Sequence, residues 1–526
     1  MTNSIAEIED AACIFVIGTN TTENHPLIAR RVFRAKEKGA KLIVADPRNI
    51  QLARFADITV HHRLGSDVAL LNGMMHIIIK NDWHVKEYIE ERTEGFDELK
   101  KVVETYTPDK VETITGVAQS DLEKMSELYA TNSPAALLYA MGITQHTTGV
   151  DNVKSCCNIA MLCGNVGVKS GGVNPLRGQN NVQGACDMGG LPNVFPAYQP
   201  VTVEANNEKF SKAWGKKLPD QIGYTITDMI PAMLDGKLKA LYVIGENPMM
   251  SDPDQNHINK ALEKLELLIC QDIFQTETTQ KADVVFAAAS VAEKEGTFTN
   301  TERRCVKVNI AIDPVGNALA DWEIISKLST AMGYEMSYKN SEEIFNEMTS
   351  VTPSYGGMTY ERLGLDGLQW PCPNSEHPGT LFLHKKQFTR GKGMFHAIEY
   401  LDPAEMPDNE YPYFLTTGRN FAHFHTGTMT RASAHLHAEQ KTGYVEINPE
   451  DANKLSVQDG DMVLLSTRRG EMKTPARVTS KIKPGVLFVP FHFAESPANI
   501  LTNPAFDPIA KIPEFKVCAA KAEKAA

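Results

Sequence analysis

Short apolar runs that end in polar turns dominate the first sixty residues. Residues 13–17 form one such run, which ends at Gly18. The amphipathic stretch 27–38 predicts a helix, and a second apolar run, 42–45, ends at Asp46. A strand, a helix and a strand in this order are typical of a parallel sheet, and the ligands of such sheets bind at the carboxyl ends of the strands.

The same pattern returns some two hundred residues later. From Gly18 to Asp46 is 28 residues, and from Gly245, which ends another apolar run, to Asp272 is 27. We interpret the two stretches as a structural repeat, although apolar strands that end in Gly or Asp are common in α/β folds. Neither copy has the full G-x-G-x-x-G of a plain NAD site. The repeat therefore predicts two similar nucleotides, or one cofactor with two similar arms.

The rest of the chain changes character twice. Between the copies lie a helical region (70–132), a buried strand (135–139) and an apolar helix (151–163). After the second copy, the polar residues 293–303 either close over a ligand or form a solvated hairpin. Residues 333–410 show weak periodicity. From residue 411 short alternating runs with tight turns predict a β-barrel. We expect the Ala- and Lys-rich tail after Cys518 to be frayed.

The predicted fold is α/β, with two Rossmann-like nucleotide-binding units and a C-terminal β-barrel domain. The predicted domains are a first dinucleotide-binding domain (1–179), a second one (180–291), a connecting region (292–405) and the barrel (406–526).

A glycine-rich segment, residues 171–190, lies between the two copies. It holds six glycines and five Asn or Gln side chains, but only two charges, Arg177 and Asp187. Glycines allow close approach of a ligand, and amides offer donors and acceptors to a neutral ring system. We interpret the segment as one wall of a large cofactor site, with Arg177 as an anchor for a small anion. A surface loop with Gly and Asn turns is the alternative.

Composition and charge exclude several other classes. The chain is 42% hydrophobic and 22% charged with a net charge of −12, and it has no run of like charges, so we expect no nucleic-acid partner. No apolar stretch reaches the ~18 residues of a membrane span, and no signal peptide precedes residue 13, so we expect a cytoplasmic protein. The nine cysteines lack C-x-x-C spacing, and we assign no metal ligand in this chain; Cys156, Cys157 and Cys163 are expected to be small buried thiols.

Specific motifs occur along nearly the whole chain. They are Gly18-Thr19-Asn20 with His25-Pro26, Asp46-Pro47-Arg48, Gly65-Ser66-Asp67, residues 141–145 (MGITQ), 177–184 (RGQNNVQG), 245–248 (GENP), 295–300 (EGTFTN), 417–419 (TGR), His423, 425–429 (HTGTM) and Asn448-Pro449. With these motifs the chain resembles the catalytic subunit of molybdopterin-dependent formate dehydrogenases, in the dimethyl sulfoxide reductase superfamily.

The resemblance implies a cofactor, a substrate and partners. The cofactor is a molybdenum or tungsten ion held by two molybdopterin guanine dinucleotides, so that each repeat holds one dinucleotide. Arg177 is the implied catalytic residue and pairs with formate, which is oxidised to carbon dioxide or formed from it, in anaerobic metabolism. An iron–sulfur or flavin subunit accepts the electrons. The implied cofactor-binding residues are Gly18, Asn20, His25, Asp46, Arg48, Gly65, Asp67, Met141, Gly142, Gln145, Gly178, Gln179, Asn180, Gly245, Glu246, Asn247, Gln271, Asp272, Thr417, Gly418, Arg419, His423, His425 and Thr426.

One departure from the family pattern stands out. Members carry an upstream four-cysteine motif for a 4Fe-4S cluster, then a selenocysteine or cysteine metal ligand followed by a histidine, and none of these occurs here. The chain is expected to be the part downstream of that ligand, inactive alone. It would be a split subunit or, as we favour, a chain that starts after an in-frame UGA codon. A non-catalytic scaffold and another molybdopterin oxidoreductase, such as a nitrate reductase, are the alternatives.

Histidines of these segments have two interpretations. His146 is expected to be a structural hydrogen-bonding residue, whereas His423 and His425 fit a structural role and a place near the site equally well.

Overall fold

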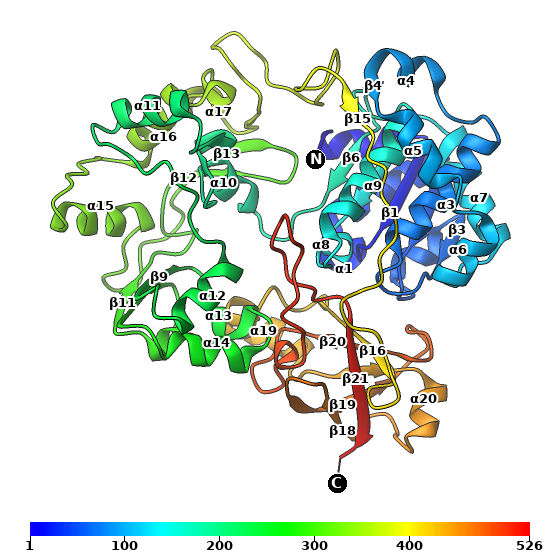
Figure 1. The fold of residues 1–526 in the computed structure, drawn as a ribbon. Helices are drawn as coiled ribbons and strands as arrows, with labels where there is room; N and C mark the ends of the chain where they lie inside the picture. Colours follow the sequence, from blue (N-terminus) through cyan, green and yellow to red (C-terminus); the bar gives the residue numbers. More distant parts are fainter. Residues whose placement is uncertain (526) are drawn as a thin grey trace. The chain divides into compact units, whose positions relative to one another are not determined.

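A computed structural model describes residues 1–525, which divide into two compact units (Figure 1). Unit 1 contains Met1–Leu176, Met250–Ile258 and Phe382–Ala526, and unit 2 contains Arg177–Met249 and Asn259–Leu381. The chain thus leaves unit 1 and returns to it, and each unit is described here by itself. The four domain boundaries expected from the sequence stay a prediction.

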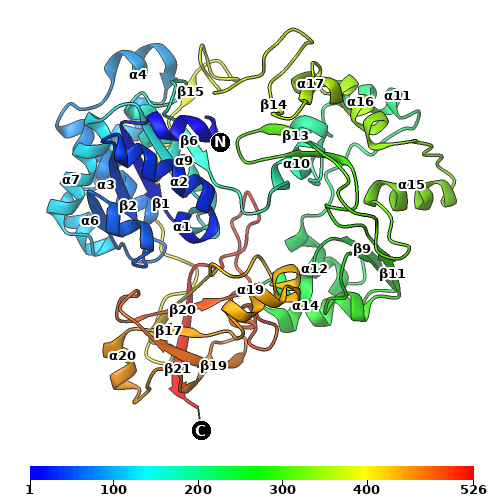
Figure 2. The ribbon, with the colours of Figure 1, turned by 180° about the vertical axis from the view of Figure 1, so that it is seen from behind.

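Unit 1 is built on a five-stranded parallel sheet, drawn in blue and cyan in Figures 1 and 2. Its strands are β1 (Cys13–Ile17), β2 (Lys41–Ala45), β3 (Ile58–Val60), β5 (Ala135–Tyr139) and β6 (Val173–Pro175), in the order β3-β2-β1-β5-β6. The chain builds outward from β1 on one side and then crosses to the other. The crossover leaves a crevice between the carboxyl ends of β1 and β5, where open α/β sheets bind ligands.

Helices cover both faces of this sheet, which makes its strands apolar on both sides. Phe15 and Ile17 of β1 belong to one buried cluster, shared with α3 (Asp67–Lys80), α7 (Gln119–Thr131) and α9 (Gly149–Leu162). Ile14 and Val16 point to the other face, against α2 (Pro26–Glu37). All five residues of β1 are at most 1% exposed. This burial explains why the strands are continuous apolar runs rather than alternating ones.

Shorter elements complete this part of unit 1. They are η1 (Ile5–Asp10), α1 (Thr21–Asn24), η2 (Gln51–Phe55), α4 (Lys86–Arg92), β4 (Thr93–Glu94), α5 (Phe96–Val103), α6 (Pro108–Thr115) and α8 (Met141–Thr144).

The expected buried thiols are confirmed for Cys156 and Cys163, and burial raises the pKa of Cys163 well above its usual value. Cys157 is only half-buried.

Unit 2 contains a second parallel sheet, of three strands in the order β11-β10-β9. The strands are β9 (Ala240–Ile244), β10 (Leu267–Asp272) and β11 (Val284–Ala287). Between β9 and β10 the chain forms α13 (Pro248–Ser251) and α14 (Gln255–Leu262), and α12 (Ile226–Leu234) precedes β9.

The two sheets share one hydrogen-bonding pattern, which confirms the repeat. The amide of Gly18 donates to the carbonyl of Ala45 at 3.1 Å, and the amide of Gly245 donates to that of Gln271 at 2.8 Å. Both glycines have a left-handed backbone, with φ of +58° and +63°. In each copy the residue whose carbonyl accepts this bond directly precedes the aspartate of the repeat: Ala45 precedes Asp46, and Gln271 precedes Asp272.

A second correspondence lies at the start of the middle strand. The amide of Leu42 donates to Asp57 Oδ2 at 2.8 Å, and the amide of Leu268 donates to Asp283 Oδ2 at 2.7 Å. Each aspartate amide returns a bond of 2.8 Å to the same leucine carbonyl. The two half-sites therefore share the same pattern of backbone hydrogen bonds.

The remainder of unit 2 contains a hairpin and several helices. The polar stretch 293–303 leads into an antiparallel hairpin of β12 (Gly296–Thr299) and β13 (Arg304–Val308), extended by β14 (Leu368–Gln369). The other elements are α10 (Val182–Asp187), β7 (Val194–Phe195), η3 (Pro196–Tyr198), β8 (Gln199–Pro200), α11 (Glu204–Ala213), η4 (Thr279–Lys281), α15 (Asp321–Ala331), α16 (Ser341–Val351), η5 (Pro353–Tyr355) and α17 (Tyr360–Leu363).

The region after residue 333 is more regular than its weak periodicity predicts. Helix α16 begins at Asn340, whose side chain accepts a hydrogen bond from the Glu343 amide at 3.0 Å. It buries Phe345, Met348 and Val351, which recur at three-residue spacing.

The C-terminal residues of unit 1 form the closed six-stranded barrel that the sequence predicts. Its strands are β16 (Tyr413–Gly418), β17 (Val445–Ile447), β18 (Met462–Ser466), β19 (Glu471–Val478), β20 (Val486–Pro490) and β21 (Cys518–Lys524), in the order β16-β20-β17-β19-β18-β21. The other elements of this part of the chain are α18 (Thr428–Ala432), α19 (Ala434–Glu439), α20 (Pro449–Lys454) and η6 (Ala498–Ile500). Before the barrel, β15 (Gly393–Met394) pairs with β4.

The expectation of a frayed tail is wrong, because the tail is the strand that closes the barrel. Strand β21 pairs antiparallel with both β16 and β18. Ala519, Ala520 and Ala522 are at most 2% exposed. Small side chains fit the tight interior, and β21 satisfies the backbone groups of two strands that would otherwise be open edges.

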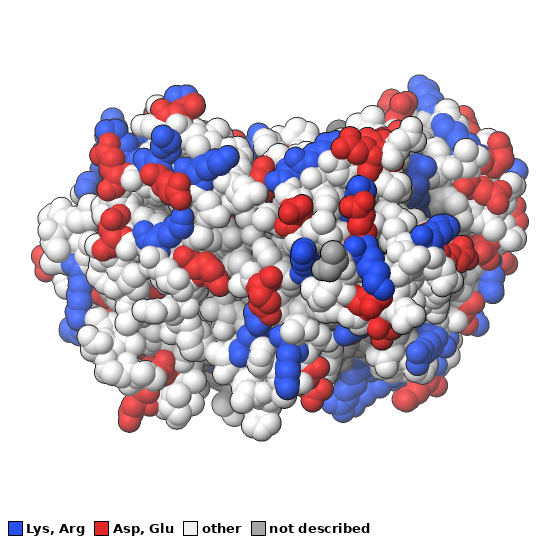
Figure 3. Space-filling view, turned by 90° about the horizontal axis from the view of Figure 1, so that it is seen from below, with Lys and Arg blue, Asp and Glu red and all other residues white. Residues whose placement is uncertain are grey.

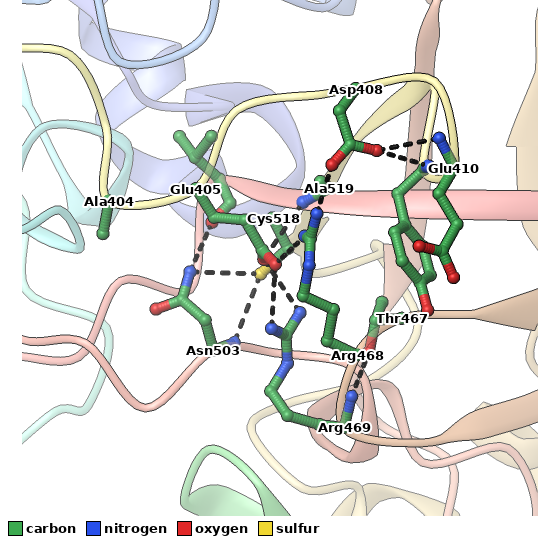
Figure 4. Close-up of polar contacts among 12 residues, drawn as sticks. Ala404, Glu405, Asp408, Glu410, Thr467, Arg468, Arg469, Asn503, Cys518 and Ala519 are labelled. Carbon is green, nitrogen blue, oxygen red and sulfur yellow. Dashed lines mark hydrogen bonds and ion pairs between the residues drawn. The ribbon is translucent and has the colours of Figure 1, made fainter.

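A polar cluster ties the connecting segment before the barrel to β21 and to the β18–β19 turn (Figure 4). Glu405 Oε2 accepts from Arg469 Nη2 at 2.9 Å and from the Ala519 amide at 3.2 Å. Arg468 pairs with both Glu405 and Asp408. Because Glu405 and Arg469 side chains are only 12% exposed, this pair is better shielded from water than most of the surface pairs.

The surface itself mixes the two charges. On the face shown in Figure 3 basic and acidic side chains lie interspersed. Many of the ion pairs are exposed, such as Lys237–Asp235 at 3.0 Å and Lys281–Glu263 at 2.9 Å, and exposed pairs contribute little to stability. Among residues 1–525 we find no helix with the length and apolar character needed to cross a membrane.

The barrel position of the tail gives a first prediction. Ala520→Glu places a carboxylate at a fully buried position and should lower the free energy of unfolding by about 2 kcal/mol or more. The exposed neighbour Glu523→Ala should change it by less than about 0.5 kcal/mol. Urea unfolding followed by circular dichroism measures both, and equal midpoints for the two variants would contradict the buried strand.

Candidate functional site

Two backbone turns meet at the crevice of the unit 1 sheet. The amide of Gly142, after β5, donates to the carbonyl of Gly18, after β1, at 3.0 Å. A Cβ atom on Gly142 would lie 2.5 Å from that carbonyl oxygen, and one on Gly18 would lie 2.9 Å from the Gly142 carbonyl carbon. Only glycines fit here. The structure therefore brings together two residues, Gly18 and Gly142, that are 124 positions apart in the chain.

Polar atoms without partners gather beside this contact. The hydroxyl oxygens of Thr19 and Thr21 are buried and have no hydrogen-bond partner within residues 1–525. Asn20, between them, accepts a bond from Thr22 Oγ1 at 3.1 Å. Buried hydroxyls are costly to leave unpaired, so they mark a place where a polar ligand fits. Thr19 belongs to the Gly18-Thr19-Asn20 motif, but neither threonine is among the predicted cofactor-binding residues, because Thr in a polar turn carries no distinctive signal of its own.

The next strand contributes a carboxylate and a guanidinium. Asp46 Oδ1 accepts from the Arg48 amide at 2.9 Å, and burial raises the pKa of Asp46. Arg48 forms a 2.8 Å ion pair with Glu446 of the barrel and stacks on Phe488 at 3.5 Å. The Glu446 side chain is 1% exposed. Arg48 thus joins the sheet and the barrel within unit 1, while its predicted contact with a cofactor stays a prediction.

Other predicted residues of unit 1 have clear packing roles. Gly65 approaches Pro403 so closely that a Cβ would lie 2.5 Å from its ring. Asp67 accepts a bond of 3.0 Å from His62, and both are buried; burial alone would raise the pKa of Asp67, but the His62 ring holds it below its usual value. These contacts account for Gly65 and Asp67 without a ligand.

The turn after β5 is held by its own hydrogen bonds. The amide of Gln145 donates to the Met141 carbonyl at 3.0 Å, and the buried His146 ring donates from Nε2 to the Gly142 carbonyl at 2.8 Å. The latter is the structural hydrogen bond expected of His146. Met141 is 38% exposed.

The barrel presents two cations to this part of unit 1. No carboxylate among residues 1–525 pairs with Arg419, which follows β16, and burial lowers its pKa to about 10. Lys516 Nζ donates to the Thr417 carbonyl at 2.7 Å; burial, and then the charge of Arg419, lower the pKa of Lys516 to about 7. Two neighbouring cations that share no carboxylate favour an anion. The sequence indicated Arg419 but not Lys516, which lies in an irregular stretch.

The same region holds two neutral imidazoles. Burial, and then the charge of Arg419, lower the pKa values of His25 and His425 to about 4. Both rings are therefore uncharged at neutral pH and can each offer one donor and one acceptor. His25 lies between α1 and α2 of the first half-site, and His425 lies in the barrel domain. Groups from both parts of unit 1 are therefore near enough to Arg419 to feel its charge.

The remaining barrel residues of the predicted site are internally bonded. His423 contacts Thr430 Oγ1 through Nδ1 at 3.2 Å and donates from Nε2 to the Gln440 carbonyl at 2.7 Å. Thr417 Oγ1 donates to the Phe515 carbonyl at 2.8 Å, and a Cβ on Gly418 would lie 2.6 Å from the Phe488 ring. Thr426 and Thr428 hydroxyls are 3.1 Å apart. His423 therefore has the contacts of a structural residue.

The half-site of unit 2 repeats this chemistry. A Cβ on Gly245 would meet nothing within 4 Å, so the turn is open. Asp272 Oδ1 accepts from the Ile273 amide at 2.7 Å, and burial raises the pKa of Asp272, as it does for Asp46. Asn247 is held by the hydroxyl of Thr278 at 2.7 Å.

Two more predicted residues of unit 2 adjoin this turn. Gln271 Nε2 donates to Asp321 Oδ1 at 2.7 Å, so its amide is already engaged. Glu246 is exposed next to Gly245. Two effects raise the pKa of Glu246. The larger is its partial removal from water by the surrounding protein, and the smaller is repulsion by the negative charge of Asp272.

The glycine-rich segment is more ordered than a loop, because residues 182–187 form helix α10. Arg177 precedes this helix, and its amide donates to Thr301 Oγ1 at 3.1 Å. Within residues 1–525 its side chain has no ion pair; Nη1 contacts Cys186 Sγ at 3.9 Å, and the buried Nε has no partner. Gly178 and Gln179 are half-buried and Asn180 is exposed.

Asp187, the other charged residue of the glycine-rich segment, does not neutralise Arg177. Asp187 is 0% exposed and accepts hydrogen bonds from Tyr355 at 2.6 Å, Trp370 at 2.7 Å and Gln183 at 2.7 Å. Burial raises the pKa of Asp187. Neutral donors therefore satisfy this carboxylate, and the charge of Arg177 stays available for an anion.

No group of three or more His, Cys, Asp and Glu side chains in the described part of the chain is arranged to hold a metal ion. Each unit offers instead a glycine turn with an adjacent carboxylate, and unit 1 adds two buried hydroxyls. Arg419 in unit 1 and Arg177 in unit 2 pair with no carboxylate of residues 1–525. In each unit these groups suit a polar ligand with anionic groups.

Comparisons with known proteins agree with this chemistry. Residues 1–331 match the family model for molybdopterin oxidoreductases, and residues 413–519 match that for the molydopterin dinucleotide binding domain. The chain is 55% identical, over 528 residues, to the F420-dependent formate dehydrogenase 1 subunit alpha of Methanococcus maripaludis, with 100% of this chain and 78% of that protein covered. It is 41% identical to formate dehydrogenase H of Escherichia coli, with 99% and 74% covered.

A solved structure shares the fold. The acetylene hydratase of Pelobacter acetylenicus superposes with a TM-score of 0.76 at 22% identity, over 99% of this chain and 81% of that one. At that identity the similarity concerns the fold alone.

The glycine contact at the crevice gives a second prediction. Gly142→Ala forces a Cβ against the Gly18 carbonyl and should lower the free energy of unfolding by about 1–3 kcal/mol. Gly223→Ala, where the nearest atom would be 3.6 Å from the new Cβ, is the matched control and should cost less than about 1 kcal/mol. Scanning calorimetry of both variants decides, and an unchanged melting temperature for Gly142→Ala would contradict the close approach.

The buried lysine gives a third prediction. Lys516 has a pKa of about 7 in the folded chain, against its ordinary 10.5. Between these pH values the unfolded chain holds a proton that the folded chain has released, so Lys516 makes folded stability rise with pH from about 7 to 10.5. In Lys516→Met this rise should be smaller, while in Lys521→Met, whose parent side chain is 44% exposed, it should match the parent protein. Chemical unfolding at pH 7 and pH 9.5 measures the difference; identical pH dependence in all three proteins would refute the shift.

Proposed function

This chain belongs to the molybdopterin oxidoreductase family, and we propose that it oxidises formate to carbon dioxide, or catalyses the reverse, as part of a formate dehydrogenase catalytic subunit. The observation that carries the proposal is Arg177, a guanidinium without a carboxylate partner in residues 1–525, set in a segment of neutral amides. The relatives that are formate dehydrogenases by name support the same substrate.

The residues present fit the cofactor. A molybdopterin guanine dinucleotide has a polar, nitrogen-rich ring system, ribose hydroxyls and a diphosphate. The glycine contact and the unpartnered Thr19 and Thr21 hydroxyls offer space and hydrogen bonds, and Arg419 and Lys516 offer positive charge for a diphosphate. Asp46 and Asp272, at the ends of equivalent strands, suit hydroxyl or amino donors.

Each half-site would hold one dinucleotide through its own set of residues. In unit 1 these are Gly18, Asn20, His25, Asp46, Arg48, Met141, Gly142, Gln145, Thr417, Gly418, Arg419, His425 and Thr426, to which we add Thr19, Thr21 and Lys516. Gly65, Asp67 and His423, which have packing or hydrogen-bond partners of their own, would support this half-site without contacting the ligand. In unit 2 they are Gly178, Gln179, Asn180, Gly245, Glu246, Asn247, Gln271 and Asp272.

When bound, the cofactor supplies a molybdenum or tungsten centre that accepts two electrons. Arg177 would bind the carboxylate of formate through its planar guanidinium and so fix the orientation of the substrate. Because Asp187 is satisfied by neutral donors, it does not compete with formate for Arg177. We propose that a selenocysteine or cysteine metal ligand and a 4Fe-4S cluster lie outside residues 1–525 and that an iron–sulfur or flavin subunit accepts the electrons.

Substitution of the arginine tests the function directly. In the assembled enzyme, Arg177→Ala should lower kcat/KM for formate by two orders of magnitude or more, and Arg177→Lys, which keeps the charge but loses the planar fork, should recover only part of it. Formate-dependent dye reduction is the assay, and the exposed Lys212→Ala is the control.

Two results would contradict the proposal. Near-parental kinetics in Arg177→Ala would exclude the assigned role. Protein that contains no molybdenum, tungsten or pterin by elemental and fluorescence analysis would favour a scaffold, and reduction of nitrate without turnover of formate would favour a nitrate reductase.

A further inference from the structure

The surroundings of Arg177 are unusual in unit 2. Arg304, in the hairpin, pairs with Glu302 at 2.9 Å, and Lys294 pairs with Asp321. Arg177 instead meets a thiol: the contact from Nη1 to Cys186 Sγ, at 3.9 Å, is its one side-chain hydrogen bond within residues 1–525. A cation that binds a substrate anion must be oriented, yet a carboxylate that oriented it would also neutralise it.

Cys186 is placed by a rigid helix. It lies on α10, directly before Asp187, whose buried carboxylate is held by Tyr355 and Trp370. At the start of the helix, Asn181 Oδ1 accepts from the Thr299 amide at 2.9 Å. Both ends of α10 are thus anchored to the rest of unit 2. The thiol consequently has a defined position relative to the backbone that carries Arg177.

Cys186 also differs from the other cysteines. Seven of the nine are buried, and the other half-buried one, Cys157, has its pKa raised by burial to about 11. Cys372 also contacts a guanidinium, that of Arg362 at 3.5 Å, but it is buried, and Arg362 donates to backbone carbonyls as well. Cys186 is half-buried, and its contact with Arg177 is the one hydrogen bond that this guanidinium makes within residues 1–525. A thiol is a weak acceptor, so it can fix the direction of an N–H group without supplying a full negative charge.

We propose that Cys186 is a positioning residue for Arg177, which orients the guanidinium toward the substrate carboxylate and leaves its charge unneutralised. The inference rests on the proposed function, because it assigns Arg177 to formate. The neutrality of the thiol is the essential property: a carboxylate at the same position would occupy Arg177 and compete with formate, whereas a hydroxyl would keep a neutral acceptor there.

Steady-state kinetics of the assembled enzyme test the charge requirement. Cys186→Asp should raise KM for formate at least tenfold and change kcat much less, because it competes for Arg177 in the free enzyme. Cys186→Ser should keep KM within about threefold of the parent enzyme, since it restores a neutral acceptor. Cys157→Ser is the control cysteine and should leave both constants unchanged. A KM in Cys186→Asp equal to that of the parent, or one in Cys186→Ser as high as in Cys186→Asp, would overturn the proposal.

Alkylation of Cys186 separates this inference from the proposed function. The guanidinium of Arg177 lies against the Cys186 sulfur and covers part of it. Arg177→Met lacks the atoms that reach the sulfur and should therefore raise the rate of iodoacetamide labelling of Cys186 at least threefold in the purified enzyme, as followed by peptide mass spectrometry, while labelling of Cys157 stays the same. An unchanged rate for Cys186 would exclude the contact.

Formate itself is the second probe in this experiment. If formate binds at Arg177, saturating formate should alter the labelling rate of Cys186 in the parent enzyme but not in Arg177→Met. A rate that depends on Arg177 but not on formate would support the contact between the two side chains and would count against formate as the ligand of Arg177.

Discussion

One backbone hydrogen bond recurs in both parallel sheets of this protein. A glycine with a left-handed backbone follows one strand, and its amide donates to the carbonyl of the residue that directly precedes an aspartate at the end of the next strand. Gly18 and Ala45 form it in unit 1, and Gly245 and Gln271 form it in unit 2. The bond fixes the turn and the carboxylate relative to each other. The placement of each glycine turn beside a carboxylate, Asp46 in unit 1 and Asp272 in unit 2, depends on this geometry.

The two sites leave polar groups unsatisfied, which is costly for folding. Thr19 and Thr21 hydroxyls are buried without partners in residues 1–525, and Arg419 and Lys516 lie close together with lowered pKa values. Each unpaired buried group costs about 1–3 kcal/mol. A stable chain keeps such groups where a ligand completes them, and bound ligand would then stabilise the fold by mass action. The large cores around β1 and within the barrel offset the cost.

Closure of the barrel shows how the two ends of unit 1 cooperate. Strand β21 satisfies the edges of β16 and β18, and Lys516, just before it, donates to the Thr417 carbonyl at the end of β16. Arg48 of the sheet reaches Glu446 of the barrel. The strand that closes the barrel thus also carries a cation to the candidate site, so that stability and ligand binding share the same residues.

The sequence by itself determined the parts of the fold that come from local patterns. Apolar runs ending in Gly or Asp predicted the parallel strands, nearly equal spacing predicted the repeat, and the composition of residues 171–190 singled out Arg177. These features are read from neighbouring residues, because strand burial and turn chemistry act over a few positions.

Tertiary structure alone decided how distant residues meet. Lys516 and the two threonines gave no local signal, the alanine tail became a barrel strand, and Asp187 turned out to be satisfied by Tyr355 and Trp370 rather than by Arg177. Burial and hydrogen bonding of a polar group depend on which segments pack around it. That packing is set by contacts far apart in the chain, and no pattern within a short stretch contains it.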